Sequence, residues 1–177
     1  IDLHCRVLAE ESFYARHTNH GLDQATVLLW AANAFPELPG AEAWSRVSQS
    51  RLHDEISFMF SPEGIHVENS PSYHVWMLGA LEELLLISDE LKRADFEWIL
   101  NEGWEYAAYA LQPNGRFPLV GDTESLDFSR VRAGRGYPGC QHYLYSATGG
   151  KAGKKPELVD GLFPVTGYAV FRDRWSY

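Results

Sequence analysis

The first two thirds of the chain consist of amphipathic segments separated by short polar breaks, and this pattern constrains the fold most strongly. Apolar residues recur at helical spacing, and most segments end at a break that contains Gly, Pro or Asn. The expected helices are Leu3–His17, Leu22–Phe35, Ala41–Phe60, Pro71–Asp89 and Arg93–Leu111. We therefore predict a mainly α fold built of helical hairpins.

The character of the sequence changes after Gly115, where Gly and Pro become frequent. Residues 122–155 show no sustained period, which predicts a connector that is partly loop. Gly167–Arg172 is β-branched and aromatic and indicates a strand that needs a partner from more chain or another molecule. We predict a helical domain over residues 1–120, then a connector and a truncated β-rich domain over residues 121–177.

Charge and hydropathy exclude some classes of partner. The chain has 177 residues and a formal net charge of −9, so no basic face is large enough to bind nucleic acid. Charge repulsion is screened beyond roughly 8 Å at physiological salt, so a local basic groove can still bind an acidic polymer. We expect no membrane span, and we expect that the true N-terminus is missing because the chain opens on Ile1.

The cysteines and histidines give little sign of a metal. Cys5 and Cys140 are too few for a disulfide scaffold and lack CxxC spacing, and their pairing stays open. His17 and His20 are three residues apart, but no third ligand follows at a convincing spacing. We expect neither a metal nor a cofactor in this chain.

Polar residues gather in three islands at the ends of expected helices: 19–21, 68–74 and 121–124. The first is Asn-His-Gly, the second contains Asn-Ser-Pro-Ser-Tyr-His, and the third begins with Gly-Asp-Thr. Antiparallel helix pairs place alternate connections on the same side of an array, so the first two islands can share one rim. A cleft would form there.

The order of these islands, with a Pro-Glu-Gly turn at 62–64 and a Gly-Tyr-x-x-x-Arg segment at 167–172, resembles the heparinase II/III-like lyases and related toroid-fold alginate lyases. The resemblance covers nearly the whole chain. It implies an incomplete (α/α) toroid, with residues 1–120 as its C-terminal part, followed by the first strands of an antiparallel β-sandwich. It also implies a periplasmic or secreted location.

The resemblance implies a polysaccharide lyase that cleaves 4-linked uronates in acidic glycans by β-elimination. Such a site must stabilise charge on the uronate carboxylate, remove the C5 proton and protonate the leaving oxygen. The resemblance assigns Asn19 and His20 to the carboxylate. We expect Tyr73 to transfer the proton, because its phenol is a well-matched acid for the leaving oxygen, and we expect His74 to orient its neighbours. In this family a further His or Tyr comes from the β-sandwich, so we expect the remainder of the chain to complete the site.

Structural roles compete with these assignments. Asn19 could cap a helix, Tyr73 could be a packing residue, and Glu68 and Asn69 could either tie down their loop or contact substrate. Three arginines in the connector could lie on a solvated loop or grip sulfate and carboxylate groups of the glycan. These are Arg130, Arg132 and Arg135.

Two other functions remain open. A glycoside hydrolase on a toroid would use paired carboxylates, for which Asp23, Glu68 and Asp122 are available. It would leave the Asn-His and Tyr-His pairs unexplained. A glycan-binding or exopolysaccharide-associated module would keep the fold without turnover. The choice among heparan-like, alginate-like and other uronate polymers also stays open.

Overall fold

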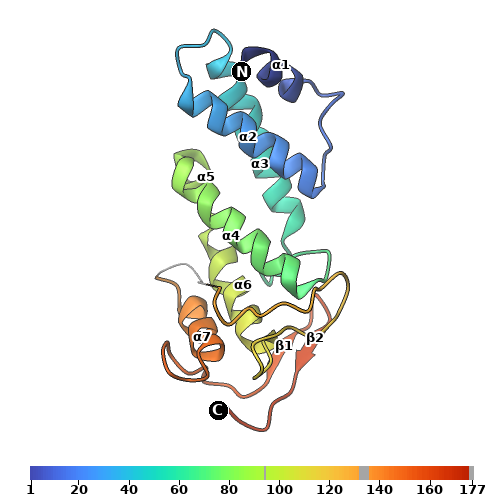
Figure 1. Cartoon of the computed structure of the whole chain (residues 1–177), viewed down its shortest axis with the longest axis vertical. Coiled ribbons are helices and arrows are strands. Elements are labelled where there is room, and N and C mark those ends of the chain that lie inside the picture. The colour runs from blue at the N-terminus through green and yellow to red at the C-terminus, as the bar shows by residue number, and fades with distance from the viewer. Residues whose placement is uncertain (94, 132–135, 176–177) are drawn as a thin grey trace. The chain divides into compact units, whose positions relative to one another are not determined.

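The computed structural model describes residues 1–93, 95–131 and 136–175 (Figure 1). Over these residues the chain forms seven helices and one two-stranded antiparallel hairpin. The helices are α1 (Asp2–Ala9), α2 (Asn19–Ala34), α3 (Ala41–Met59), α4 (Pro71–Ile87), α5 (Asp89–Arg93), α6 (Glu97–Ala110) and α7 (Pro138–Ala147). The strands are β1 (Gly161–Phe163) and β2 (Tyr168–Val170). The mainly helical fold predicted from the sequence is confirmed.

The chain divides into two compact units. The first comprises Ile1–Met59 and Leu84–Asp95, and the second comprises Phe60–Glu83 and Phe96–Tyr177. This division does not test the predicted boundary near residue 120 between a helical domain and a truncated β-rich domain, so that boundary stays a prediction. Throughout the described residues, every helix is too short or too polar to span a lipid bilayer.

In the first unit, α2 packs against α3, and α1 contacts both. The buried cluster there contains Cys5, Leu28, Ala32, Ala41 and Trp44. Arg51 of α3 is 7% exposed, and its guanidinium donates to the carbonyl oxygens of Leu8 at 2.7 Å and Ala9 at 3.0 Å. Because the final carbonyls of a helix lack partners within it, this contact satisfies the end of α1. The first helix therefore ends at Ala9, and its predicted extension to His17 is wrong.

In the second unit, α6 packs against α7 around a core rich in aromatic residues. Trp104 and Tyr143 lie with ring centroids 4.7 Å apart, and the Tyr143 hydroxyl donates to the carbonyl of Phe128 at 2.9 Å. Helix α7 falls inside the segment for which the sequence predicted only a connector. The helix predicted over Arg93–Leu111 is shorter in the structure, where it is α6 (Glu97–Ala110). Arg93 belongs instead to the separate short helix α5.

The strand expected near Gly167–Arg172 is present as β2, and it pairs with β1 in the register Gly161 to Val170 and Phe163 to Tyr168. Glu63 anchors the turn of this hairpin. Its carboxylate accepts from the backbone N–H groups of Val165 at 3.0 Å and Thr166 at 2.9 Å, and from the Thr166 hydroxyl at 2.7 Å. Burial by itself raises the pKa of Glu63, but these donors outweigh it and lower the pKa below its ordinary 4.5.

The two cysteines, whose pairing the sequence left open, are both buried free thiols. Cys5 belongs to α1 in the first unit and Cys140 to α7 in the second. Burial raises the pKa of the Cys140 thiol to about 12. A thiol with so high a pKa is a poor nucleophile at neutral pH, so Cys140 is a packing residue.

Candidate functional site

The first polar island lies at the start of α2. Thr18 is the N-cap residue, and its hydroxyl oxygen accepts from the backbone N–H of Gly21 at 3.1 Å. Asn19 and His20 are therefore the first two residues of α2, and the interpretation of Asn19 as the cap is wrong. His20 is exposed and Asn19 half-buried. Asn19 Oδ1 is itself buried, and within the described part of the chain it has no hydrogen-bond partner.

This arrangement favours an anion. The first N–H groups of a helix have no partner within it, and the helix dipole places positive potential at the same end. The exposed imidazole of His20 and the amide of Asn19 add donor groups there. The start of α2 can therefore present several hydrogen-bond donors to a carboxylate.

The second island lies at the start of α4, where Pro71 suits the first helical position. Tyr73 is half-buried, and its ring packs edge-on against Trp76 with centroids 5.2 Å apart. His74 is 1% exposed and therefore cannot touch a substrate. Because His74 is next to Tyr73 in the chain, its hydrogen bonds help to fix the backbone that carries Tyr73.

Both ring nitrogens of His74 are engaged. Nδ1 accepts from the backbone N–H of His66 at 3.2 Å, so Nε2 carries the proton and donates to the Gly103 carbonyl oxygen at 2.9 Å. Burial lowers the pKa of His74 to about 4; the Gly103 bond opposes this shift and the neighbouring His66 adds to it. His74 is thus a neutral imidazole in one tautomer, which fixes the first turn of α4.

The second and third islands lie together in the second unit. The Ser70 and Thr123 hydroxyl oxygens are 3.1 Å apart, and the Glu124 N–H donates to the Ser72 hydroxyl oxygen at 3.3 Å. The late Gly-Tyr segment joins them, because the Tyr168 hydroxyl donates to the Asn69 carbonyl at 2.9 Å. Motifs separated by up to 99 positions in the chain are therefore joined by hydrogen bonds.

The residues predicted to bind substrate have simpler surroundings. Glu68 and Arg130 are exposed. Asn69 is also exposed, has a φ of 54°, and donates from Nδ2 to the Val67 carbonyl at 3.2 Å. This bond ties down the loop, as the structural alternative proposed. Arg132 and Arg135 lie outside the described residues.

The other candidates are placed as follows. Asp23 and Asp122, the carboxylates considered for a hydrolase, are both exposed. His17 pairs with Asp54 through Nε2 at 3.1 Å. Over the described ranges, no group of three His, Cys, Asp or Glu side chains could hold a metal ion. The expectation of no metal and no cofactor stays a prediction.

The second unit contains a cavity of about 700 Å³ that the sequence did not indicate. Its lining includes Tyr106, Tyr109, Gln112, Tyr168, Arg172 and Arg174, and none of the predicted site residues that the structure describes. The Arg172 guanidinium is engaged there, because it donates to the carbonyls of Tyr109 at 2.7 Å and Leu111 and lies over the Trp175 ring. Arg172 therefore binds the end of α6 to the hairpin.

Comparison with known proteins bears on this geometry. The family model described as the N-terminus of heparinase II/III matches residues 3–137. The chain belongs to the heparinase II/III family. The motifs quoted for the resemblance fall largely within the matched region, so the family expected from the sequence is confirmed.

Curated relatives in this family include two named heparin-sulfate lyases. The chain is 30% identical over 176 residues to the one from Pedobacter heparinus and 25% identical over 187 residues to the one from Bacteroides stercoris. These matches cover 92% and 99% of this chain but only 26% and 28% of the relatives. The chain therefore spans about a quarter of the length of the curated relatives.

A solved structure matches the fold as well. A mutant of the heparan sulfate lyase from Pedobacter heparinus superposes with a TM-score of 0.70 and 26% sequence identity. The match covers 97% of this chain and 28% of the lyase chain. The helices and the hairpin thus correspond to part of a heparan sulfate lyase.

Proposed function

We propose that these residues form part of a polysaccharide lyase that cleaves 4-linked uronates in acidic glycans by β-elimination. The observation that carries the proposal is the start of α2, where Asn19 and His20 add an amide and an exposed imidazole to the N-terminus of a helix. The relatives named heparin-sulfate lyases support a sulfated uronate polymer as the first substrate to test.

In the proposed reaction, Asn19 and His20 donate hydrogen bonds to the uronate carboxylate. Their donation strengthens as negative charge builds on that carboxylate, so the C5 proton becomes easier to remove. The C5 proton passes to a base, a role that we propose for the further catalytic side chain supplied by the remainder of the protein. The electrons of the C5–H bond form the C4–C5 double bond, and the electrons of the C4–O bond leave with the oxygen. The leaving oxygen gains a proton, which the Tyr73 hydroxyl is suited to supply.

We assign His74 a positioning role in this reaction. It is buried directly beside Tyr73 in the first turn of α4, and its two nitrogens bind the backbone of His66 and Gly103. These bonds restrict the backbone that carries Tyr73. A phenol held in one orientation transfers a proton more efficiently than a mobile one.

The wider setting is part of the same proposal. We propose that the helices belong to an incomplete (α/α) toroid over residues 1–120 and that residues 121–177 lead into an antiparallel β-sandwich. The remainder of the protein would complete the site and supply a further catalytic side chain. Glu68, Asn69 and the arginines Arg130, Arg132 and Arg135 would contact the acidic glycan, and the location would be periplasmic or secreted.

Product analysis tests the proposed reaction against its alternatives. The complete natural protein that contains these residues is incubated with heparan sulfate, alginate and other uronate polymers. A lyase produces C4–C5 unsaturated uronate, which absorbs in the ultraviolet, together with new reducing ends. New reducing ends without that absorbance would indicate hydrolysis by paired carboxylates. Binding without either product would indicate a glycan-binding module.

A further inference from the structure

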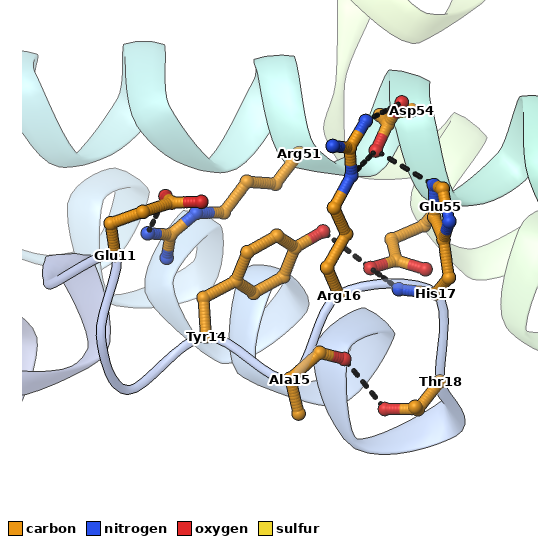
Figure 2. A network of polar contacts seen from close by, with 9 residues as sticks. All are labelled: Glu11, Tyr14, Ala15, Arg16, His17, Thr18, Arg51, Asp54 and Glu55. Atoms are coloured by element: carbon orange, nitrogen blue, oxygen red, sulfur yellow. Dashed lines mark hydrogen bonds and ion pairs between the residues drawn. The ribbon is translucent and has the colours of Figure 1, made fainter.

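Glu55 of α3 packs against residues 14–17, the segment that leads into α2, and its side chain is fully buried at 0% exposure. Figure 2 shows its carboxylate directed at that segment from α3. Oε1 accepts from the Tyr14 hydroxyl and from the backbone N–H of His17 at 2.9 Å. Oε2 is buried too, and no described residue provides it with a hydrogen bond. One oxygen of Glu55 thus holds two points of the segment.

The neighbours of Glu55 on α3 hold the same turn. The Asp54 carboxylate accepts two hydrogen bonds from the Arg16 guanidinium, at 2.8 and 2.9 Å, and lies 3.1 Å from His17 Nε2 (Figure 2). The His17 ring stacks on Phe58 with centroids 3.9 Å apart. His17 has a φ of 59°, a left-handed conformation that is costly for a residue with a side chain. Several contacts offset that cost at this one position.

Gly21, which follows Asn19 and His20 in the chain, leaves room for the Glu55 carboxylate. A Cβ atom on Gly21 would lie 2.7 Å from Glu55 Oε1 and 2.3 Å from the Ala15 carbonyl oxygen. Only glycine allows the first turn of α2 to approach the carboxylate this closely. In the chain, Asn19 and His20 therefore lie between His17, whose N–H donates to Glu55 Oε1, and Gly21, whose lack of a side chain leaves room for the same oxygen atom.

Stability alone explains this arrangement poorly. Removing a carboxylate from water costs several kcal/mol, and hydrogen bonds to both oxygens are needed to offset that cost. Here one oxygen carries all the bonds that the described residues supply. A buried group that stabilises the fold poorly is a candidate for a role in fixing local geometry.

We infer that Glu55 is a positioning residue for Asn19 and His20, fixing the start of α2 in the orientation that binds the uronate carboxylate. This inference rests on the proposed β-elimination. Glu55 acts through the backbone on both sides of the pair, so it alters the reaction without touching substrate. Misplacement of a catalytic group by about 1 Å can cost roughly 100-fold in rate.

Glu55→Gln in the complete protein tests the inference. The substitution keeps the side-chain size but weakens the acceptor for Tyr14 and His17. We expect kcat per folded molecule to fall about 10- to 100-fold while KM changes less than about threefold. Glu42→Gln, at an exposed position of the same helix, is the matched control and should keep the wild-type kcat.

The double variant Asn19→Ala with Glu55→Gln separates positioning from general destabilisation. If Glu55 acts through Asn19 and His20, Glu55→Gln should lower kcat less than about twofold in a protein that already carries Asn19→Ala. Equal losses of kcat in both backgrounds would overturn the inference.

Tyr14→Phe is the second variant, used if Glu55→Gln does not fold. It removes one donor to Glu55 and keeps the ring that packs against the Arg51 guanidinium, so it tests the same positioning role through kcat.

The outcomes also separate this inference from the proposed function. A wild-type protein that forms no unsaturated product overturns both. A wild-type protein that forms it, with full kcat retained in Glu55→Gln and Tyr14→Phe, overturns only the role of Glu55. Loss of kcat in both variants, with folding preserved, supports the positioning role.

Discussion

Two buried histidines, one of them in the second island, make the stability of the protein depend on pH. His66 and His74 are each 1% exposed, and burial lowers the pKa of each to about 4. In the unfolded chain both would titrate near the ordinary value of 6.5. The native state therefore keeps two neutral imidazoles over a range of pH in which the unfolded chain binds protons. Folding and proton binding must be coupled there.

This coupling predicts loss of stability in mild acid. Between pH 6.5 and about 4 the unfolded state binds more protons, so the free energy of unfolding falls as the pH falls. Each histidine contributes up to about 1.4 kcal/mol per pH unit. His74→Gln should lower Tm at pH 7 yet make the decline of Tm from pH 7 to 5 shallower.

The control for this experiment is His4→Gln, an exchange at an exposed position, which should keep the wild-type slope. Thermal unfolding followed by circular dichroism across this pH range measures the effect. An acid slope in His74→Gln as steep as that of the wild-type protein would show that proton binding by His74 is not coupled to folding.

Single residues also show how far sequence reasoning reaches. Asn19, His20 and Tyr73 could be identified because each lies in a polar island next to a helix boundary. Glu55 could not, because it lies within an amphipathic helix between ordinary polar neighbours, and only the fold shows it to be buried. The sequence does contain a signal for the cap at Thr18, since Thr before a helical run is a preferred N-cap.

At the scale of elements, the two clearest errors have physical causes. Helix α1 ends early because Arg51, which is 42 positions away from Ala9, binds its last carbonyls. No local pattern reports such a contact. The sequence does not predict helix α7, because Gly and Pro are frequent after Gly115 and residues 122–155, which include Pro138 and Gly139, show no sustained period. Pro is nevertheless favoured in the first turn of a helix, and Gly139 allows close packing on α6.

The packing of α7 gives a prediction about glycine. A Cβ on Gly139 would lie 2.1 Å from the Asn101 carbonyl oxygen and 2.7 Å from the Glu105 nitrogen, both backbone atoms of α6. Gly139→Ala should therefore destabilise the protein by about 1 to 3 kcal/mol, because two helix backbones must separate. Urea denaturation of the complete protein measures the change.

Gly79 of α4 supplies the opposite case. A Cβ there would meet no atom within 4 Å, so Gly79→Ala should stabilise the protein by about 0.5 to 1 kcal/mol through a less flexible unfolded chain. If both substitutions shifted the urea midpoint equally, the close contact between α6 and α7 would not explain the role of Gly139.

At the scale of the whole molecule, the family follows from motifs spread along the chain rather than from any one of them. The match to the heparinase II/III model spans residues 3–137, and the similarity to heparin-sulfate lyases runs over most of the chain. Asn19 and His20 belong to the first compact unit, whereas Tyr73 and His74 belong to the second. The sequence-based expectation that both pairs line one cleft stays a prediction. Sequence patterns specify local structure, such as a helix end, better than the way in which distant elements meet.

The initial rate of ultraviolet absorbance from C4–C5 unsaturated uronate, measured for the complete protein and its Tyr73→Phe variant, tests this account most directly. Tyr145→Phe, a half-buried tyrosine on α7, is the control. We predict that the wild-type protein and the control release unsaturated product, and that Tyr73→Phe lowers kcat about 10²- to 10⁴-fold with KM little changed. Full activity in Tyr73→Phe, or cleavage without unsaturated product, would contradict the account.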